Sequence, residues 1–319
     1  MMRRYLPLLI TIAFCVPAGT AGYPLQTSHD QAGHARVTGT KVSLTPPANF
    51  VPAMQFPGFM DEENGATIMV MEWPLPYTEL SQAFTEDNMA TKGMLLLARK
   101  DVSFGDKKGI LLHVKQGVNS DVFLKWIGFT GNESESVMIT ATFPEDLKTQ
   151  LTSSLEKAVL SAKWDAGLKM DLAEGLNFTI KDDPSLKQAS KIGKSLIFTK
   201  DGTIPKSPSR EPFLVIGPNI SKVLSADRRS FAERRLDATE DITDVKITKA
   251  SEVTIDGLPG IEIVAAGRWV REPAGDAIIY QVILFESETY YLLQGFASTK
   301  DREKYLPAFN RIAQSFQKK

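Results

Sequence analysis

The chain has 319 residues, a length that predicts two domains of ordinary size rather than one extended core. Hydrophobic residues make up 43% of it and charged residues 24%, which excludes disordered, collagen-like and polytopic membrane proteins. Lysine and arginine number 37 and the acidic residues 38, so there is no overall field to attract nucleic acid or an anionic membrane. The composition therefore predicts a globular protein with no nucleic-acid partner.

The first 21 residues have the pattern of a secretory signal peptide. Arg3 and Arg4 supply positive charge, an apolar run covers 6–16, and small residues occupy 18–21. The run is too short for a bilayer span, which needs about 20 residues. We therefore expect cleavage after Ala21, by the general secretory route or by twin-arginine export, and no stable membrane insertion of the mature chain.

The cysteine content points to the same compartment. Cys15, the only cysteine, lies in the apolar run, so the cleaved chain would contain no disulfide. An exported protein of this size without disulfides is typical of a bacterial periplasm, and we expect a periplasmic or secreted location. A polar, flexible leader is predicted over 22–40. Its His29 and His34 would bind a metal only weakly on a mobile tether, so no metal site and no cofactor are predicted.

An internal repeat at an offset of 151 residues sets the predicted architecture. Residues 101–112, with the sequence DVSFGDKKGILL, match residues 252–263, with the sequence EVTIDGLPGIEI. Gly109 recurs as Gly260. Each block is typical of a strand, a tight glycine turn and a second strand.

The same elements surround this block in both halves. Strands or extended segments are predicted at 41–44, 67–71, 122–129 and 137–142, and again at 176–180, 212–216, 278–285 and 290–297. Helical spacing is found at 80–84 and 147–162, and again at 223–236 and 305–316.

This order predicts an α+β fold with two tandem domains, each a mostly antiparallel sheet covered by helices. The first domain is expected at 41–165 and the second at 175–319, joined by a short linker with turn residues. Pro307 predicts that the last helix starts near residue 306 or has a broken first turn.

The second half resembles the PsbP-like superfamily, named for an extrinsic protein of photosystem II. The likeness lies in Gly257-Leu-Pro-Gly260 before a strand, in the strand 290–297, and in the helix that contains Tyr305-Leu-Pro-Ala-Phe309. The first half lacks the Leu-Pro-Gly turn, and its membership rests on the repeat. The resemblance implies two tandem PsbP-like domains and a non-catalytic assembly, stabilising or binding role, without any particular chemistry.

Motifs for catalysis are weak. Gly193-Lys-Ser195 ends like a phosphate-binding loop, but Gln188 replaces the required glycine and a strand is expected after Ser195. His113 is the only histidine outside the leader, on a strand face that it shares with Lys115. We favour a partly covered structural histidine over a general base there, and we predict no catalytic residue.

Isolated polar groups allow two interpretations. Lys125 and Gln281 are equivalent polar residues in two apolar strands. They either mark a pocket or lie at the rim of the sheet with their polar ends in water, and we favour the rim.

Four arginines at 228, 229, 234 and 235 are interleaved with acidic residues, which favours an exposed ion-paired face over an anion site.

Aromatic residues beside prolines supply the candidate binding residues. Trp73 and Tyr77 flank one such loop, and Trp269 and Arg271 lie at another. Exposed rings in loops mark contact surfaces, whereas the competing interpretation is that each tryptophan closes the edge of its own core. The hypothesis is an exported, non-catalytic binding or assembly factor with an unidentified protein partner in the cell envelope. The alternative is an enzyme or small-molecule carrier that uses a cleft between the domains.

Overall fold

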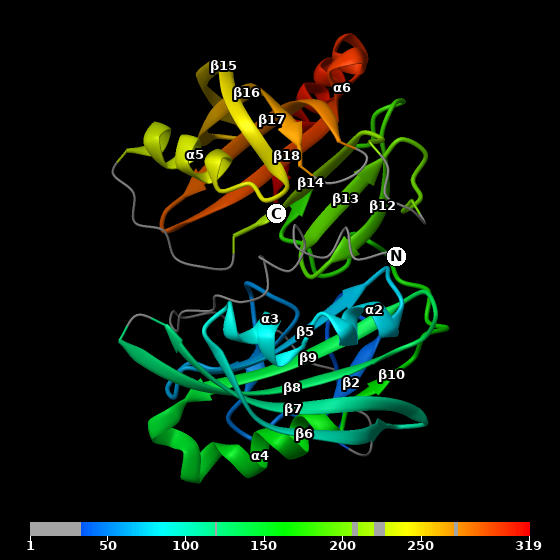
Figure 1. Cartoon of the computed structure of the whole chain (residues 1–319), viewed down its shortest axis with the longest axis vertical. Helices are drawn as coiled ribbons and strands as arrows, with labels where there is room; N and C mark the ends of the chain where they lie inside the picture. Colours follow the sequence, from blue (N-terminus) through cyan, green and yellow to red (C-terminus); the bar gives the residue numbers. More distant parts are fainter. Residues whose placement is uncertain (1–32, 119, 206–209, 220–226, 271–273) are drawn as a thin grey trace. The chain divides into compact units, whose positions relative to one another are not determined.

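The computed structural model describes residues 33–118, 120–205, 210–219, 227–270 and 274–319. One compact unit ends at Gly175 and the other begins at Leu176; they are called the first and second domain here. Each contains a seven-stranded sheet in which all neighbouring strands are antiparallel (Figure 1). The predicted α+β class with two sheet domains is confirmed. The predicted signal peptide lies outside the described residues.

The first domain is built on one large and one small sheet. The large sheet has the order β3 (Val51–Pro52), β4 (Gly58–Asp61), β5 (Ala66–Trp73), β9 (Ser136–Pro144), β8 (Asp121–Gly131), β7 (Lys107–Val118) and β6 (Met94–Phe104). The small sheet contains β1 (Ala35–Arg36), β2 (Val42–Leu44) and β10 (Lys163–Trp164). The helical segments are α2 (Tyr77–Gln82), α3 (Glu86–Ala90), the 3-10 turn η2 (Glu145–Leu147) and α4 (Lys148–Leu160).

The second domain repeats this plan. Its large sheet has the order β12 (Lys187–Ile192), β13 (Ser195–Thr199), β14 (Phe213–Pro218), β18 (Thr289–Ser298), β17 (Gly275–Glu286), β16 (Leu258–Trp269) and β15 (Ile242–Ile255). A small pair contains β11 (Phe178–Thr179) and β19 (Gln317–Lys318). The helical segments are α5 (Arg228–Asp237), the 3-10 turn η3 (Thr299–Asp301) and α6 (Arg302–Gln314).

Strand by strand, the two large sheets have the same topology, and β6 corresponds to β15 at one edge. The hairpins keep the register of the sequence repeat, because Val102 pairs with Gly109 and Val253 with Gly260. In both domains an early strand, β2 or β11, pairs with the strand that follows the last helix. Two copies of one domain plan therefore account for both halves of the chain.

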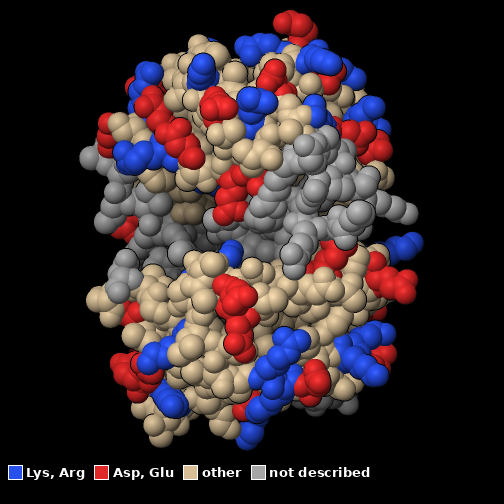
Figure 2. Space-filling view, viewed as in Figure 1, with Lys and Arg blue, Asp and Glu red and all other residues tan. Residues whose placement is uncertain are grey.

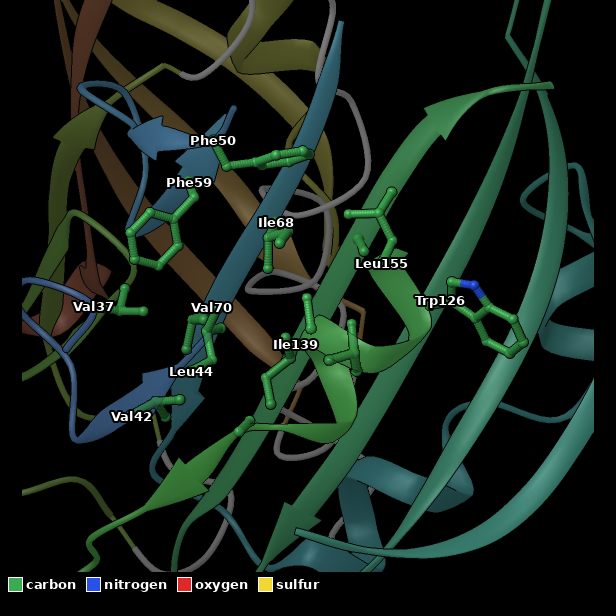
Figure 3. Packing of buried hydrophobic residues seen from close by; sticks show 14 of the residues in the cluster. Val37, Val42, Leu44, Phe50, Phe59, Ile68, Val70, Trp126, Ile139 and Leu155 are labelled. Carbon is green, nitrogen blue, oxygen red and sulfur yellow. The ribbon is translucent and has the colours of Figure 1, made fainter. Parts of the chain in front are cut away.

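The core of the first domain lies between α4 and one face of the sheet (Figure 3). Leu155 and Val159 of α4 are fully buried with Ile68 and Ile139 of the sheet. This is the apolar stripe that the helical spacing predicts, and each such side chain contributes roughly 1.5–3 kcal/mol on burial. On the opposite face, the ring of Phe84 lies 4.4 Å from the ring of Phe129.

Two sequence predictions differ from the structure. Residues 35–36, placed in the flexible leader, form β1, and Ala35 and Val37 are buried in the first core. The prediction for Pro307 is wrong, since α6 begins at Arg302 and contains the proline. The missing N–H removes one helical hydrogen bond, and packing of the buried Tyr305 and Phe309 compensates for it.

The glycine that recurs in both hairpins stands where the neighbouring strand leaves no room for a side chain. A Cβ at Gly109 would overlap the carbonyl oxygen of Phe129 and lie 2.7 Å from the ring of Phe104. A Cβ at Gly260 would lie 2.6 Å from the carbonyl oxygen of Ile283. The close approach of β8 to β7, and of β17 to β16, therefore requires glycine.

We expect Gly109→Ala to lower the free energy of unfolding of the first domain by about 1–3 kcal/mol, the usual cost of overpacking. Gly117→Ala, in the same strand, is the matched control because a Cβ there meets no atom within 4 Å. Urea denaturation followed by tryptophan fluorescence measures both variants. Equal stability of the two would show that β7 and β8 separate without cost.

Candidate functional site

The two tryptophans of the candidate loops are not exposed rings. Trp73, at the end of β5, is 1% exposed and offers almost no surface to a partner. Trp269, at the end of β16, is half-buried and packs against Phe213 and Phe296, with ring centroids 6.2 and 5.4 Å away. The competing interpretation, a ring that closes the edge of its own core, fits Trp269. The exposure that the contact hypothesis requires is absent at Trp73.

The other two loop candidates have different outcomes. Tyr77 is the first residue of α2 and is half-buried, and its backbone N–H donates to the carbonyl oxygen of Asn132 at 2.9 Å. Burial raises the pKa of the Tyr77 hydroxyl, while the positive charge of Arg99 acts to lower it. Arg271 lies outside the described residues.

Lys125 and Gln281 are both buried, so neither is the rim residue that we favoured. Gln281 Nε2 donates to the carbonyl oxygen of Ala232 in α5 at 2.8 Å. Its Oε1 accepts from Gln294 Nε2 at 3.1 Å, and the same amide donates to Thr239 Oγ1 at 2.9 Å. Gln281 therefore fastens α5 to the second sheet. Lys125 lies in β8 between neighbouring strands of the first sheet.

His113 stacks on Trp126, with ring centroids 4.1 Å apart and an interplanar angle of 15°. Its Nε2 is buried and has no hydrogen-bond partner among the described residues. Burial lowers the pKa of His113, the charges of Lys148 and Lys100 add to that effect, and Glu156 opposes it. Burial therefore disfavours the charged imidazole, and no described carboxylate orients it as a general base.

The Gly-Lys-Ser motif is the turn of a β-hairpin. Gly193 has a φ of 59°, and β13 begins at Ser195, as the sequence predicts. Burial and the neighbouring Lys191 lower the pKa of Lys194 to about 8. Because a strand rather than a helix follows the turn, this segment lacks the geometry of a phosphate-binding loop.

The arginines of α5 lie among opposite charges. Arg229 Nε contacts Glu233 Oε1 at 3.0 Å, one helical turn away, and the guanidinium of Arg228 lies 5.5 Å from the ring centroid of Phe285. Figure 2 shows positive and negative side chains interspersed over the visible face. These contacts fit the ion-paired interpretation better than an anion site.

Glu262 of β16 is a buried carboxylate with three close donors. Oε1 accepts from the Tyr280 hydroxyl and from Asn310 Nδ2, both at 2.9 Å, and Oε2 accepts from Lys249 Nζ at 2.8 Å. Burial acts to raise the pKa of Glu262, but these hydrogen bonds outweigh burial and the pKa is lowered. Leu111 occupies the equivalent position of the first domain. The network joins β15, β17 and α6, so its role is structural.

Two kinds of feature are absent from the described ranges. No group of three or more histidine, cysteine, aspartate or glutamate side chains there is placed to hold a metal ion. In the same part of the chain, no helix has the length and apolar character needed to cross a membrane.

Two exposed leucines lie on an open edge of the first sheet. β6 is the last strand of that sheet (Figure 1), and Leu95 and Leu97 on it are 61% and 44% exposed. A free edge presents unpaired backbone N–H and C=O groups, so apolar side chains beside it favour the addition of another strand. Sequence reasoning missed this surface, because a leucine run without alternation is typical of a buried strand.

The equivalent edge of the second domain is built differently. The register of β6 shifts between Leu96 and Ala98, and that of β15 shifts between Ile247 and Lys249, the same two positions in the repeat. In β15 the exposed Lys246 replaces the leucine at position 95. Charged side chains on an edge oppose pairing with another strand. The repeat alignment is the sequence signal that distinguishes the two edges.

We expect Glu262→Gln to lower the free energy of unfolding of the second domain at pH 7 by about 1–3 kcal/mol, because hydrogen bonds to a charged group are lost. The lowered pKa means that the carboxylate stabilises the fold above its unfolded value of 4.5 and that this contribution is lost as the pH falls through the folded value. The variant should therefore lose less stability than the wild type on acidification.

Glu252→Gln is the matched control for this measurement, because it removes the same charge from the exposed edge strand β15. Denaturation curves at a series of pH values compare the three proteins. Identical acid sensitivity of Glu262→Gln and the wild type would contradict the assigned role of the network.

Comparison with known proteins gives matches to solved structures alone. No protein-family model and no curated protein matches the chain. Cyanobacterial PsbP from Synechocystis sp. PCC 6803 is 11% identical, with a TM-score of 0.29 over 45% of this chain and 82% of that one. LpqN of Mycobacterium tuberculosis, described as involved in cell envelope biogenesis, is 13% identical, with a TM-score of 0.31 over 44% and 82%.

A third match spans both domains. The immunity protein TplEi of the T6SS of Pseudomonas aeruginosa is 12% identical, with a TM-score of 0.33 over 91% of this chain and 99% of that one. The first two matches cover less than half of this chain, and the third covers most of it.

Proposed function

We propose that the chain is an exported, non-catalytic protein-binding factor of the cell envelope, and that the open edge of β6 pairs with an extended segment of its protein partner. The observation that carries the proposal is the exposure of Leu95 and Leu97 beside the unpaired backbone of an edge strand. The exported location rests on the signal pattern of residues 1–21.

Strand addition supplies both affinity and selectivity at such an edge. Backbone hydrogen bonds to the added strand give affinity that is independent of sequence, and alternate side chains select the partner. Burying each of the two leucines contributes roughly 1.5–3 kcal/mol. Apolar burial of this size at the centre of a contact is enough to form a binding hot spot.

The alternative, an enzyme, has less support from the side chains that the structure describes. A general base needs a partner that orients it, and His113 instead stacks on Trp126 with its buried Nε2 unpaired among the described residues. The buried carboxylate of Glu262 is fully occupied by donors from its own domain. A binding role therefore stands first.

We expect a photo-cross-linking residue in place of Leu95 to capture one protein partner in the cells that produce the chain. The same residue in place of Val51 should capture none, although Val51 is 49% exposed, because it lies on β3 at the opposite edge of the sheet. Mass spectrometry of the cross-linked products identifies the partner and the segment that contacts β6.

A second substitution in the cross-linking protein tests the apolar contact. In the protein that carries the cross-linking residue at position 95, Leu97→Lys should reduce the yield of cross-linked partner about tenfold. The reason is that Leu97 would be buried against the partner in the complex, and the lysine removes that apolar contact. Ile247→Lys, on the edge strand of the second domain, should leave the yield unchanged. Capture of the same protein from positions 51 and 95 would refute the proposed edge.

A further inference from the structure

We infer that two copies of the chain pair through β6 when no other partner occupies this edge, as antiparallel strands related by a two-fold axis at Lys100. The inference goes beyond the proposed function, because it concerns the edge before a partner binds. Its basis is the segment 98–102, in which the exposed Arg99 and Asp101 lie two residues apart. This segment has a charge pattern that is complementary to itself.

The segment lies on the regular side of the bulge. From residue 98 to 104, β6 pairs with β7 without a further register shift. Successive side chains of such a strand point to opposite faces of the sheet. Lys100 lies opposite Leu111, a residue of the core that α4 covers, so Arg99 and Asp101 lie together on the other face.

The charges of Arg99 and Asp101 form no ion pairs within the part of the chain that the structure describes. Lys100 between them differs, because its Nζ contacts Glu156 Oε1 of α4 at 2.7 Å. Antiparallel pairing about Lys100 sets Arg99 of one copy opposite Asp101 of the other, and the two-fold axis repeats this contact. Opposite charges directly across two strands stabilise the pair.

The backbone of the edge suits the same register. On an edge strand, every second residue directs its N–H and C=O groups away from the sheet. The register joins residues an even number of positions apart, as 99 and 101 are. Within the regular segment, the outward-directed residues of one copy therefore face those of the other, and both strands can complete their backbone hydrogen bonds.

The residue on the axis meets its own copy. Two lysines directly opposite each other would repel, but each Lys100 already contacts Glu156 of its own chain. The two-fold axis thus brings together two lysines and two glutamates on the face of α4. No charge of this segment is left without an opposite charge beside it.

The equivalent edge of the second domain lacks this pattern. Ala250 of β15 stands where β6 has Arg99, and Glu252 stands where β6 has Asp101. Self-pairing of β15 in the same register would set a glutamate opposite an alanine. Of the two equivalent edges, the one with the exposed leucines is also the one that is self-complementary.

The paired segment is short, which makes the dimer weak, since small interfaces belong to transient complexes. A partner strand that adds contacts to the leucines displaces the second copy, because both use the same backbone groups of β6. Two-fold pairing is also closed, so it ends at the dimer and leaves no β6 edge for a third copy.

The test measures self-association of the purified protein by sedimentation velocity over a range of concentrations. Arg99→Asp and Asp101→Arg each replace two opposite-charge contacts by two like-charge contacts, so either variant should dimerise about tenfold more weakly at low ionic strength. An equimolar mixture of the two variants should regain the affinity of the wild type, because every cross-strand contact then joins opposite charges.

Glu252→Arg is the matched control, because it makes the charge change of Asp101→Arg at the equivalent position of β15. It should leave the dimer unchanged. A wild type that stays monomeric at millimolar concentration would overturn the inference. So would either β6 variant that dimerises as the wild type does.

The register has a test of its own. Both variants are made in a Cys15→Ser background, which leaves one cysteine in the chain. Lys100→Cys should form a disulfide-linked dimer on mild oxidation, because the residue on the axis meets its own copy. Ser103→Cys, an exposed position of the same strand, should not, since the two copies of that residue lie far from the axis. Equal yields of linked dimer would refute an axis at Lys100.

Discussion

The contact of a glycine with the backbone of the next strand is the constraint on which both domains depend. At Gly109 and Gly260 the adjacent strand, β8 or β17, leaves no space for a Cβ. On their other side the same glycines pair with Val102 of β6 and Val253 of β15. A slip of one residue in either hairpin would turn every side chain of the edge strand to the opposite face, so the position of this glycine is tied to the faces that the edge strands present.

Within this shared frame, the two copies have diverged at equivalent positions. Leu111 packs in the apolar core of the first domain, whereas the residue in its place, Glu262, recruits donors from three elements of the second. A buried carboxylate is tolerated only where such donors surround it, so the second domain depends on polar contacts that the first does not need. The edge strands differ in the same sense, because Lys246 of β15 stands where β6 has Leu95. At these two positions the second domain has the charged residue and the first domain the apolar one.

The sequence predicts the repeated elements well because they depend on local pattern. The hairpins, the long central strands and the closing helices follow from glycine turns and apolar spacing, and apart from the start of α6 they lie where they were expected. The short strands β3, β4 and β12 were not predicted, since two to six residues carry too little pattern to distinguish them from loops. The burial of Trp73 and the exposure of Leu95 are also absent from local pattern, because both depend on which strand ends the sheet. Part of the candidate site therefore becomes visible only when the strand order is known.

An apolar sheet edge is normally a liability, and the fold of β6 explains how it is tolerated. The bulge between Leu96 and Ala98 interrupts the regular ladder and increases the local twist, which disfavours the flat edge-to-edge pairing that leads to aggregation. The same bulge turns Leu95 to the opposite face of the sheet from Arg99 and Asp101. A strand that pairs with β6 must follow this bend, so the bulge protects the edge in the free protein and also restricts which strands can pair with it.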